Sequence, residues 1–293
     1  MGLLDLFKKR KSPQGQGLDT GELARRLGVD LDTLISFQPR YTEFNIPKRG
    51  GGQRRILAPE RPLKSFQRVI LRRVLALLVS HPAANGFERG KSIITNARLH
   101  IGKPVVVRMD IRDFFTSTTD KRAEHFFRRI GWDKPAAKLL TKLCTYEGGL
   151  PQGAPTSPRL ANLVNYRLDT RLDRLAAKAG AMYSRYADDL TFSFDRDEPG
   201  RIRSFIRLVR RIVSDEGYHV HKRRKMSVRR RHQQQCVTGL VVNERINLPR
   251  ATRRRLRAIA HNLANGRSAT LTETQMQGWR AFRQSIEAPV EVE

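Results

Sequence analysis

The chain of 293 residues has only two cysteines, Cys144 and Cys236, and neither lies in a metal-ligand spacing or a disulfide framework. It also lacks a run of about 18 apolar residues, the length needed for a membrane-spanning helix. The N-terminal residues turn basic after Phe7, without the apolar core and small-residue cleavage site of a signal peptide. These absences argue against a disulfide-rich secreted domain, and we expect a cytoplasmic protein with no membrane partner.

Acidic residues are scarce. Asp and Glu total 28 against 57 Lys and Arg, which gives a net charge of +29. The imbalance is strongest over residues 201–260, where 18 basic residues accompany three acids. A charge run can be a solvated face, and an anionic membrane surface also attracts cations. Because these basic residues are interleaved with globular patterning over sixty positions, they favour nucleic acid as the partner.

Two of the few acids stand side by side in Tyr186-Ala187-Asp188-Asp189, between two β-type runs. The pattern predicts a hairpin with both acids at its turn. Adjacent carboxylates repel, so either one has a raised pKa or a divalent cation holds both ionised. A third acid, Asp110, ends a buried-type strand over 105–110. An Asp pair alone is ordinary turn chemistry, but three carboxylates on neighbouring strands predict a two-Mg²⁺ site for phosphoryl transfer.

Two further segments have clear patterns. Residues 44–57 predict a basic hairpin around a glycine-rich turn, where Lys48, Arg54 and Arg55 could meet a triphosphate; an ordinary glycine turn is the alternative. Residues 63–80 predict a helix with Leu77 on its buried face.

Three motifs, taken in order, resemble the palm of a reverse transcriptase: residues 110–115 (DIRDFF), residues 150–158 (LPQGAPTSP) and residues 186–189 (YADD). The resemblance implies that Asp110, Asp188 and Asp189, helped by the backbone carbonyl of Ile111, bind two magnesium ions.

The same resemblance implies nucleotide contacts. Phe115 matches the aromatic steric gate that selects deoxynucleotides, and Gln152 matches a residue that contacts the incoming nucleotide. Lys48 and either Arg54 or Arg55 match the cations that meet its triphosphate. Asp113 has an open role: it could cap a helix or turn, or hydrogen-bond the nucleotide.

Two shorter elements narrow the resemblance to bacterial retron reverse transcriptases, over residues 40–265. Asn96-Ala97-Arg98-Leu99-His100 is similar to their Asn-Ala-x-x-His element, and Val237-Thr238-Gly239 to their Val-Thr-Gly element. In that family these regions engage the cognate noncoding RNA, which implies RNA contacts here for Asn96, His100, Val237, Thr238 and Gly239. Each has a plain structural alternative: a helix cap, a satisfied histidine and a β-turn.

One segment departs from the family. Where retron enzymes usually have Asn-x-x-Lys-Thr, this chain has His221 followed by four basic residues. A lysine there can protonate the departing pyrophosphate, and either Arg224 or Lys225 takes that place, although arginine is a poor acid. The basic residues expected to grip the template–primer backbone are Lys222, Arg223, Arg224, Lys225, Arg253, Arg254 and Arg257.

We therefore expect an α+β fold of the right-hand polymerase type, with fingers, an antiparallel-sheet palm and a small, basic, helical thumb. The expected parts are a tail at 1–17, N-terminal helices and fingers at 18–104, a palm at 105–245 with a fingers insertion at about 116–150, and a thumb at 246–293.

By resemblance, the enzyme copies part of a bound noncoding RNA into single-stranded DNA from deoxynucleoside triphosphates. Priming comes from an RNA 2′-hydroxyl and leaves an RNA–DNA product. No segment resembling ribonuclease H follows the palm motifs, so RNA removal is expected from a host ribonuclease H in trans. An effector protein and a role in defence against phage are also implied. The alternatives are a diversity-generating or abortive-infection reverse transcriptase, or an RNA-binding scaffold that restrains a toxic effector.

Overall fold

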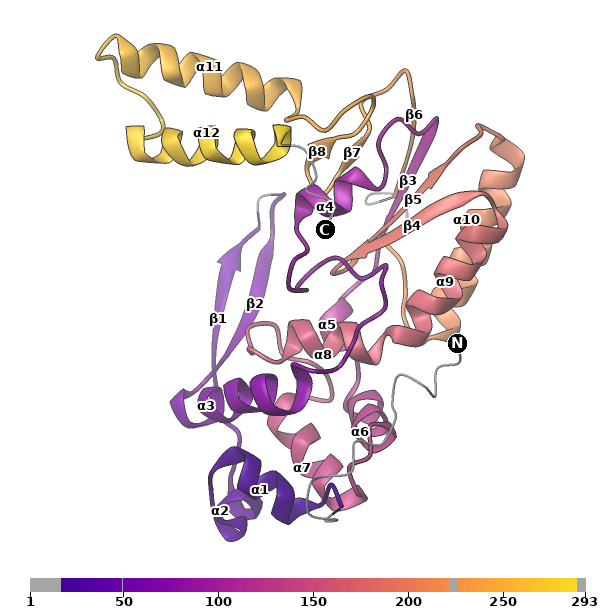
Figure 1. The fold of residues 1–293 in the computed structure, drawn as a ribbon. Helices are drawn as coiled ribbons and strands as arrows, with labels where there is room; N and C mark the ends of the chain where they lie inside the picture. The colour runs from indigo at the N-terminus through magenta and orange to yellow at the C-terminus, as the bar shows by residue number, and fades with distance from the viewer. Residues whose placement is uncertain (1–16, 49, 222–225, 289–293) are drawn as a thin grey trace. The chain divides into compact units, whose positions relative to one another are not determined.

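Residues 17–48, 50–221 and 226–288 are described by a computed structural model, shown in Figure 1. The chain forms two units. Unit 1 consists of Met1–Pro82, Arg112–Thr170 and Val213–His219, and unit 2 consists of Ala83–Ile111, Arg171–Ile212 and Val220–Glu293. The expected tail lies outside the described residues except for Gly17, as do Lys222, Arg223, Arg224 and Lys225. Among the described residues, no helix is long and apolar enough to cross a membrane.

Unit 1 is mainly helical and contains one two-stranded antiparallel sheet, β1–β2. Asp caps start several of its helices: the side chains of Asp19, Asp30 and Asp133 accept hydrogen bonds from backbone amides three residues later. Its elements are α1 (Thr20–Leu27), α2 (Leu31–Ser36), β1 (Tyr41–Pro47), β2 (Gln53–Pro59), α3 (Arg61–Ile70), the π-helical turn η2 (Leu71–Leu75), α5 (Phe114–Ser117), α6 (Asp120–Arg129), α7 (Lys134–Cys144), α8 (Ser157–Val164) and the start of α9 (Tyr166–Lys178).

The helix expected over residues 63–80 is shorter in the structure. The α-helical part ends at Ile70 and a π-helical turn continues it to Leu75. The π turn changes the rotation of the residues that follow it. Leu75 is buried, whereas Leu77 is 84% exposed. The expectation that Leu77 lies on the buried face is therefore wrong.

Unit 2 is built on a four-stranded sheet in the order β4-β5-β3-β6, in which every neighbouring pair is antiparallel (Figure 1). A second, two-stranded sheet pairs β7 with β8. Its elements are α4 (Ile93–Arg98), β3 (Val105–Asp110), the end of α9, β4 (Ala181–Tyr186), β5 (Asp189–Phe194), most of α10 (Pro199–Asp215), β6 (Ser227–Arg230), β7 (Cys236–Val237), β8 (Leu240–Val241), α11 (Arg250–Ala264) and α12 (Glu273–Glu287).

The two faces of the four-stranded sheet differ because side chains alternate along each strand. On one face, Phe192 and Phe194 of β5 both pack edge-on against Phe205 of α10, with ring centroids 5.0 Å apart. The other face takes every second residue of β3 and β5, beginning with Asp110 and Asp189. Further along that face, Val106 packs into an apolar cluster with α4 and the β7–β8 hairpin. The sheet therefore has an apolar side beneath α10 and a side that carries the acids.

Candidate active site

The acidic hairpin forms as the sequence predicts. Tyr186 ends β4 and pairs with Asp189, the first residue of β5, so that Ala187 and Asp188 make a two-residue turn. Ala187 has φ of +56°, a left-handed conformation that is uncommon for a residue with a Cβ. Such backbone strain persists only where the surrounding structure fixes it, and it concentrates at functional sites.

The loop before α4 supports this turn. Asn85 donates its backbone N–H to the Arg185 carbonyl at 2.7 Å, and Arg185 donates to the Ala83 carbonyl at 2.8 Å. A Cβ added to Gly86 would lie only 2.8 Å from the Ala187 nitrogen. Gly86 therefore allows the loop to pack directly on the backbone of the acidic turn.

The three aspartates are brought together by the pairing of β3 with β5. Asp110 is the direct register partner of Asp189, and the N–H of Ile111 donates to the Asp188 carbonyl at 2.9 Å. Cβ atoms of directly opposed residues in an antiparallel pair lie about 4.5–5.5 Å apart. The carboxylates of Asp110 and Asp189 thus leave the same face of the sheet side by side.

Two basic side chains lie against these acids. An Arg108 guanidinium nitrogen lies 3.2 Å from an Asp189 carboxylate oxygen, and His221 Nε2 lies 3.3 Å from Asp110 Oδ1. His221 also donates its backbone N–H to the Asp110 carbonyl at 2.8 Å. With these rotamers, no three Asp, Glu, His or Cys residues in the described part of the chain converge as a metal cluster. The donor chemistry nevertheless fits a hard divalent cation, because paired carboxylate oxygens are its preferred ligands.

Arg108 and His221 were missed by the sequence reasoning. Arg108 lies two residues before Asp110 on the same strand, so the two-residue period of a β-strand places both on one face. That signal was available in the sequence. The contact of His221 with Asp110 depends on a tertiary approach that no local pattern encodes.

The expected triphosphate cations lie on the β1–β2 hairpin of unit 1. Arg55 forms ion pairs with Glu43 and Glu147, both at 2.6 Å. These contacts raise the pKa of the Arg55 guanidinium and lower the pKa of both carboxyls, because each charge stabilises the other. Arg54, on the opposite face of β2, makes no ion pair with any described residue. Of the two arginines, Arg54 is therefore the one that is available to a phosphate.

Gln152 is held beside this hairpin. Its carbonyl accepts the Leu57 N–H at 2.9 Å. This hydrogen bond holds the turn that contains Gln152 against β2. The neighbouring Gly153 has φ of +134°, and a Cβ there would lie 2.7 Å from the Leu57 carbonyl oxygen. This turn thus needs glycine both for its backbone conformation and for its close approach to β2.

Asp113 and Phe115 lie at the start of α5, also in unit 1. Asp113 is the N-cap residue with φ of +48°, yet its side chain makes no capping hydrogen bond. It pairs instead with Arg112, at 3.1 Å. The carbonyl of Phe115 accepts the Leu150 N–H at 3.2 Å, and its ring is partly exposed. The capping role considered for Asp113 is therefore not found, and its contact with nucleotide stays a prediction.

The two retron-like elements have buried side chains. Asn96, His100 and Val237 are all 0% exposed, whereas Thr238 is partly exposed and Gly239 is exposed. Both polar side-chain atoms of Asn96 are buried without a hydrogen-bond partner among the described residues, and Ser92, not Asn96, caps α4. An unpaired buried amide costs about 1–3 kcal/mol. Direct RNA contact by the three buried side chains stays a prediction, and it requires them to become accessible.

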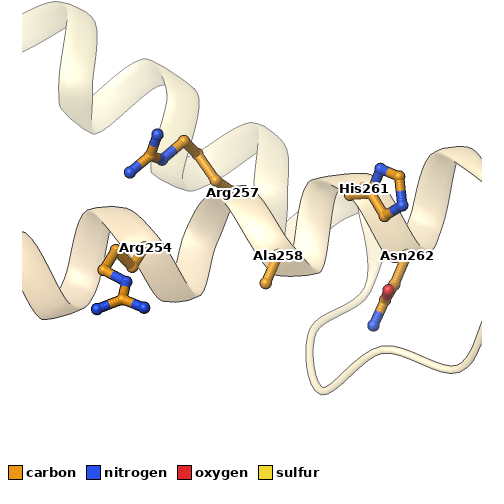
Figure 2. Close-up of a pocket in the computed structure, with 5 residues that line it drawn as sticks. All are labelled: Arg254, Arg257, Ala258, His261 and Asn262. Atoms are coloured by element: carbon orange, nitrogen blue, oxygen red, sulfur yellow. The ribbon is translucent and has the colours of Figure 1, made fainter.

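The basic residues expected to grip nucleic acid lie on α11. Arg253, Arg254 and Arg257 are all exposed. Figure 2 shows Arg254 and Arg257 projecting from a stretch of α11 that also carries Ala258, His261 and Asn262, the five residues that line a shallow pocket. The pocket has the positive charge that a phosphate backbone needs, and no carboxylate lines it.

Comparison with known proteins assigns the class. A family model described as "Reverse transcriptase (RNA-dependent DNA polymerase)" matches residues 46–240. The fold also matches a telomerase from Candida albicans, solved with a fragment of telomeric RNA, with a TM-score of 0.54 at 12% identity over 79% of this chain and 49% of that one. The chain belongs to the reverse transcriptase family, and its mixed α+β fold with antiparallel sheets is of that type.

The curated relatives narrow the assignment. The chain is 39% identical to the retron Mx65 reverse transcriptase of Myxococcus xanthus, over 89% of this chain and 66% of that protein. It is 37% identical to the retron Mx162 enzyme of the same organism (90% and 63%), and 34% identical to the retron Ec86 enzyme of Escherichia coli (90% and 83%). The chain is therefore a member of the retron reverse transcriptases, and its matched part spans about two thirds of the length of the two Myxococcus proteins.

The contact between Gly86 and the acidic turn predicts a sensitive position. In Gly86→Ala, the new methyl group must displace the Ala187 backbone or the loop. We expect nucleotide addition to fall by about tenfold or more, since a shift of about 1 Å at reacting groups costs far more rate than stability. Single-nucleotide extension and thermal unfolding measure the two effects. Gly200→Ala, where a Cβ meets nothing within 4 Å, is the control. Full activity in Gly86→Ala would contradict the supporting role of the loop.

Proposed function

We propose that this chain is an RNA-directed DNA polymerase whose chemistry takes place at Asp110, Asp188 and Asp189. The observation that carries the proposal is the β3–β5 register, which opposes Asp110 to Asp189 directly beside the turn that holds Asp188. The chain has a net charge of +29, yet it gathers three acids at one end of the sheet. Because like charges repel, a bound cation explains this cluster better than a purely structural role does.

The three aspartates, with the Ile111 carbonyl, would hold two Mg²⁺ ions. Bound there, the ions would activate the attacking hydroxyl and neutralise the leaving pyrophosphate. The chain's own contribution is to hold the carboxylates in position through the pairing of β3 with β5. Arg108 lies against Asp189 and His221 lies against Asp110, and they must give up these contacts, at least in part, to the stronger charge of the ions.

The nucleotide contacts are proposed in unit 1. Arg54 and Lys48 would meet the triphosphate, with Arg55 anchoring the hairpin through Glu43 and Glu147. Gln152 and Asp113 would contact the nucleotide, and Phe115 would exclude a ribose 2′-hydroxyl. This refines the choice between Arg54 and Arg55 in favour of Arg54.

The subdomains are proposed with the boundaries expected from the sequence. Fingers occupy 18–104 together with an insertion at about 116–150, the palm occupies 105–245 and the basic thumb begins at 246. The α4 and β7–β8 elements and the basic face of α11 would engage template and primer.

Membership of the retron family supports the finer proposals. The template is a cognate structured noncoding RNA, synthesis starts from a 2′-hydroxyl of that RNA, and the product is single-stranded DNA joined to RNA. A ribonuclease H from the host would remove copied RNA, and an effector protein would use the complex in defence against phage. The other function considered, a non-catalytic scaffold, does not account for the paired register of Asp110 and Asp189.

Replacing both turn acids tests the site. Asp188→Ala with Asp189→Ala should abolish DNA synthesis, a loss of at least about a thousandfold, because the carboxylates act on the transition state. The Kd for RNA should change by less than about twofold, because the removal of two negative charges does not weaken the attraction between the basic protein and the phosphate backbone. Primer extension and filter binding measure the two quantities. Synthesis of full-length DNA by this variant would rule out the assignment of these acids.

Replacing the aromatic ring tests sugar selection. Phe115→Ala should raise the incorporation of ribonucleotides relative to deoxynucleotides by about tenfold or more, because space opens beside the 2′ position. The ratio of kcat/KM for a matched ribo- and deoxynucleotide measures this selectivity. Phe114→Leu, next to it and facing the protein interior, is the matched control. An unchanged ratio in Phe115→Ala would show that another residue forms the gate.

A further inference from the structure

A buried histidine joins the two strands of the acidic hairpin. One ring nitrogen of His100 lies 2.7 Å from the Ser193 hydroxyl of β5, and the other lies 2.7 Å from the Ser184 hydroxyl of β4. His100 is fully buried, and burial lowers the pKa of its ring to about 3. The ring is therefore neutral at physiological pH, so that it donates one hydrogen bond and accepts the other.

The positions of the two serines matter. Ser184 lies two residues before Tyr186, and Ser193 lies four residues after Asp189, both on the sheet face that carries the acids. Both serines are 0% exposed. His100 thus fixes the spacing of β4 and β5 from the side of the sheet on which Asp110 and Asp189 stand.

A strained turn contacts the start of the segment 93–100, the segment that ends at His100. Thr238 and Gly239 form the two-residue turn between β7 and β8, with φ of +46° and +86°. A β-branched residue at positive φ is a true conformational outlier. The Thr238 hydroxyl donates at 2.8 Å to the carbonyl of Ile93, the first residue of α4. Strain of this kind needs a compensating contact, and this hydrogen bond supplies one.

Helix α4 connects these two contacts. It runs from Ile93 to Arg98, and His100 follows two residues after its end. Ala97, the last residue but one of the helix, is buried in one apolar cluster with Val106 of β3 and Val237 of β7. In Figure 1, α4 lies beside the β7–β8 hairpin. The segment 93–100 is therefore attached to the Thr238 turn at one end and to the acidic hairpin at the other.

We propose that His100 and Thr238 are positioning residues of the polymerase site, which act through the segment 93–100 on the hairpin that carries Asp188 and Asp189. The proposal rests on the proposed function of those acids. Its consequence is that the side chain of His100 serves the rate of nucleotide addition and not the recognition of RNA, because none of its surface reaches solvent.

The test compares full-length variants on the cognate RNA, measuring kcat and KM for one deoxynucleotide, the Kd for RNA and the unfolding midpoint. His100→Leu should lower kcat by about tenfold or more through a misplaced hairpin, while KM and Kd change by less than about twofold. Ser184→Ala with Ser193→Ala should give a similar loss. Adding His100→Leu to that pair should lower kcat little further, because residues that act as one unit are not additive.

Thr238 offers a second pair of variants that change the fold little. Thr238→Ser keeps the hydroxyl and should retain kcat within about twofold. Thr238→Val keeps the shape of the side chain but removes the hydroxyl that donates to Ile93, and it should lower kcat several-fold. Equal kcat in Thr238→Val and Thr238→Ser would overturn the role of the hydrogen bond to Ile93.

Gln235→Leu is the matched structural control. Gln235 is fully buried and donates to the carbonyls of Lys103, Pro104 and Arg229, and none of these hydrogen bonds ends on β4 or β5. It should lower the unfolding midpoint but keep kcat when assayed well below that midpoint. The proposal fails if His100→Leu behaves like Gln235→Leu, or if His100→Leu raises the Kd for RNA and leaves kcat intact. Inactivity of the unaltered protein, or activity of the Asp188→Ala, Asp189→Ala variant, would instead overturn the proposed function.

Discussion

The antiparallel pairing of β3 with β5 is the constraint on which the rest of the site depends. Because side chains alternate between the faces of a sheet, a slip of one residue in this register would send Asp110 and Asp189 to opposite faces. The register is fixed on the reverse face by apolar residues, among them Phe192 and Phe194 against Phe205. Core packing on one side of the sheet therefore determines the geometry of the acids on the other side.

The distribution of charged residues also fits a site for cations and nucleic acid. The chain has a net charge of +29, yet it places acids side by side and gives each a basic neighbour, Arg108 for Asp189 and His221 for Asp110. In unit 1, Arg55 is neutralised by Glu43 and Glu147, whereas Arg54 makes no ion pair with any described residue. The positive charge left on the surface, as on α11, suits a polyanion. The few acids in turn stand at the proposed cation site, in ion pairs such as those of Arg55, or at helix N-caps.

The sequence was most informative where local rules act alone. The acidic hairpin and the strand that ends at Asp110 follow from apolar β-type runs and a turn between two of them, and the structure has both. Local rules failed where tertiary contacts decide. The π-helical turn before Leu77 reversed an expected burial, and His100 appears in the sequence as a polar residue of a short motif although it packs wholly inside unit 2. Its partners, Ser184 and Ser193, lie more than 80 residues away, a distance over which no sequence period extends.

The number of metal ions held at the site tests the central claim most directly. In a complex of the protein with primed RNA template and a matched deoxynucleotide, with the primer blocked at its 3′ end, bound Mn²⁺ can be counted by electron paramagnetic resonance. The account predicts two ions for each complex, and the loss of at least one when Asp110→Asn and Asp189→Asn are combined. Two ions retained in that double variant would contradict it.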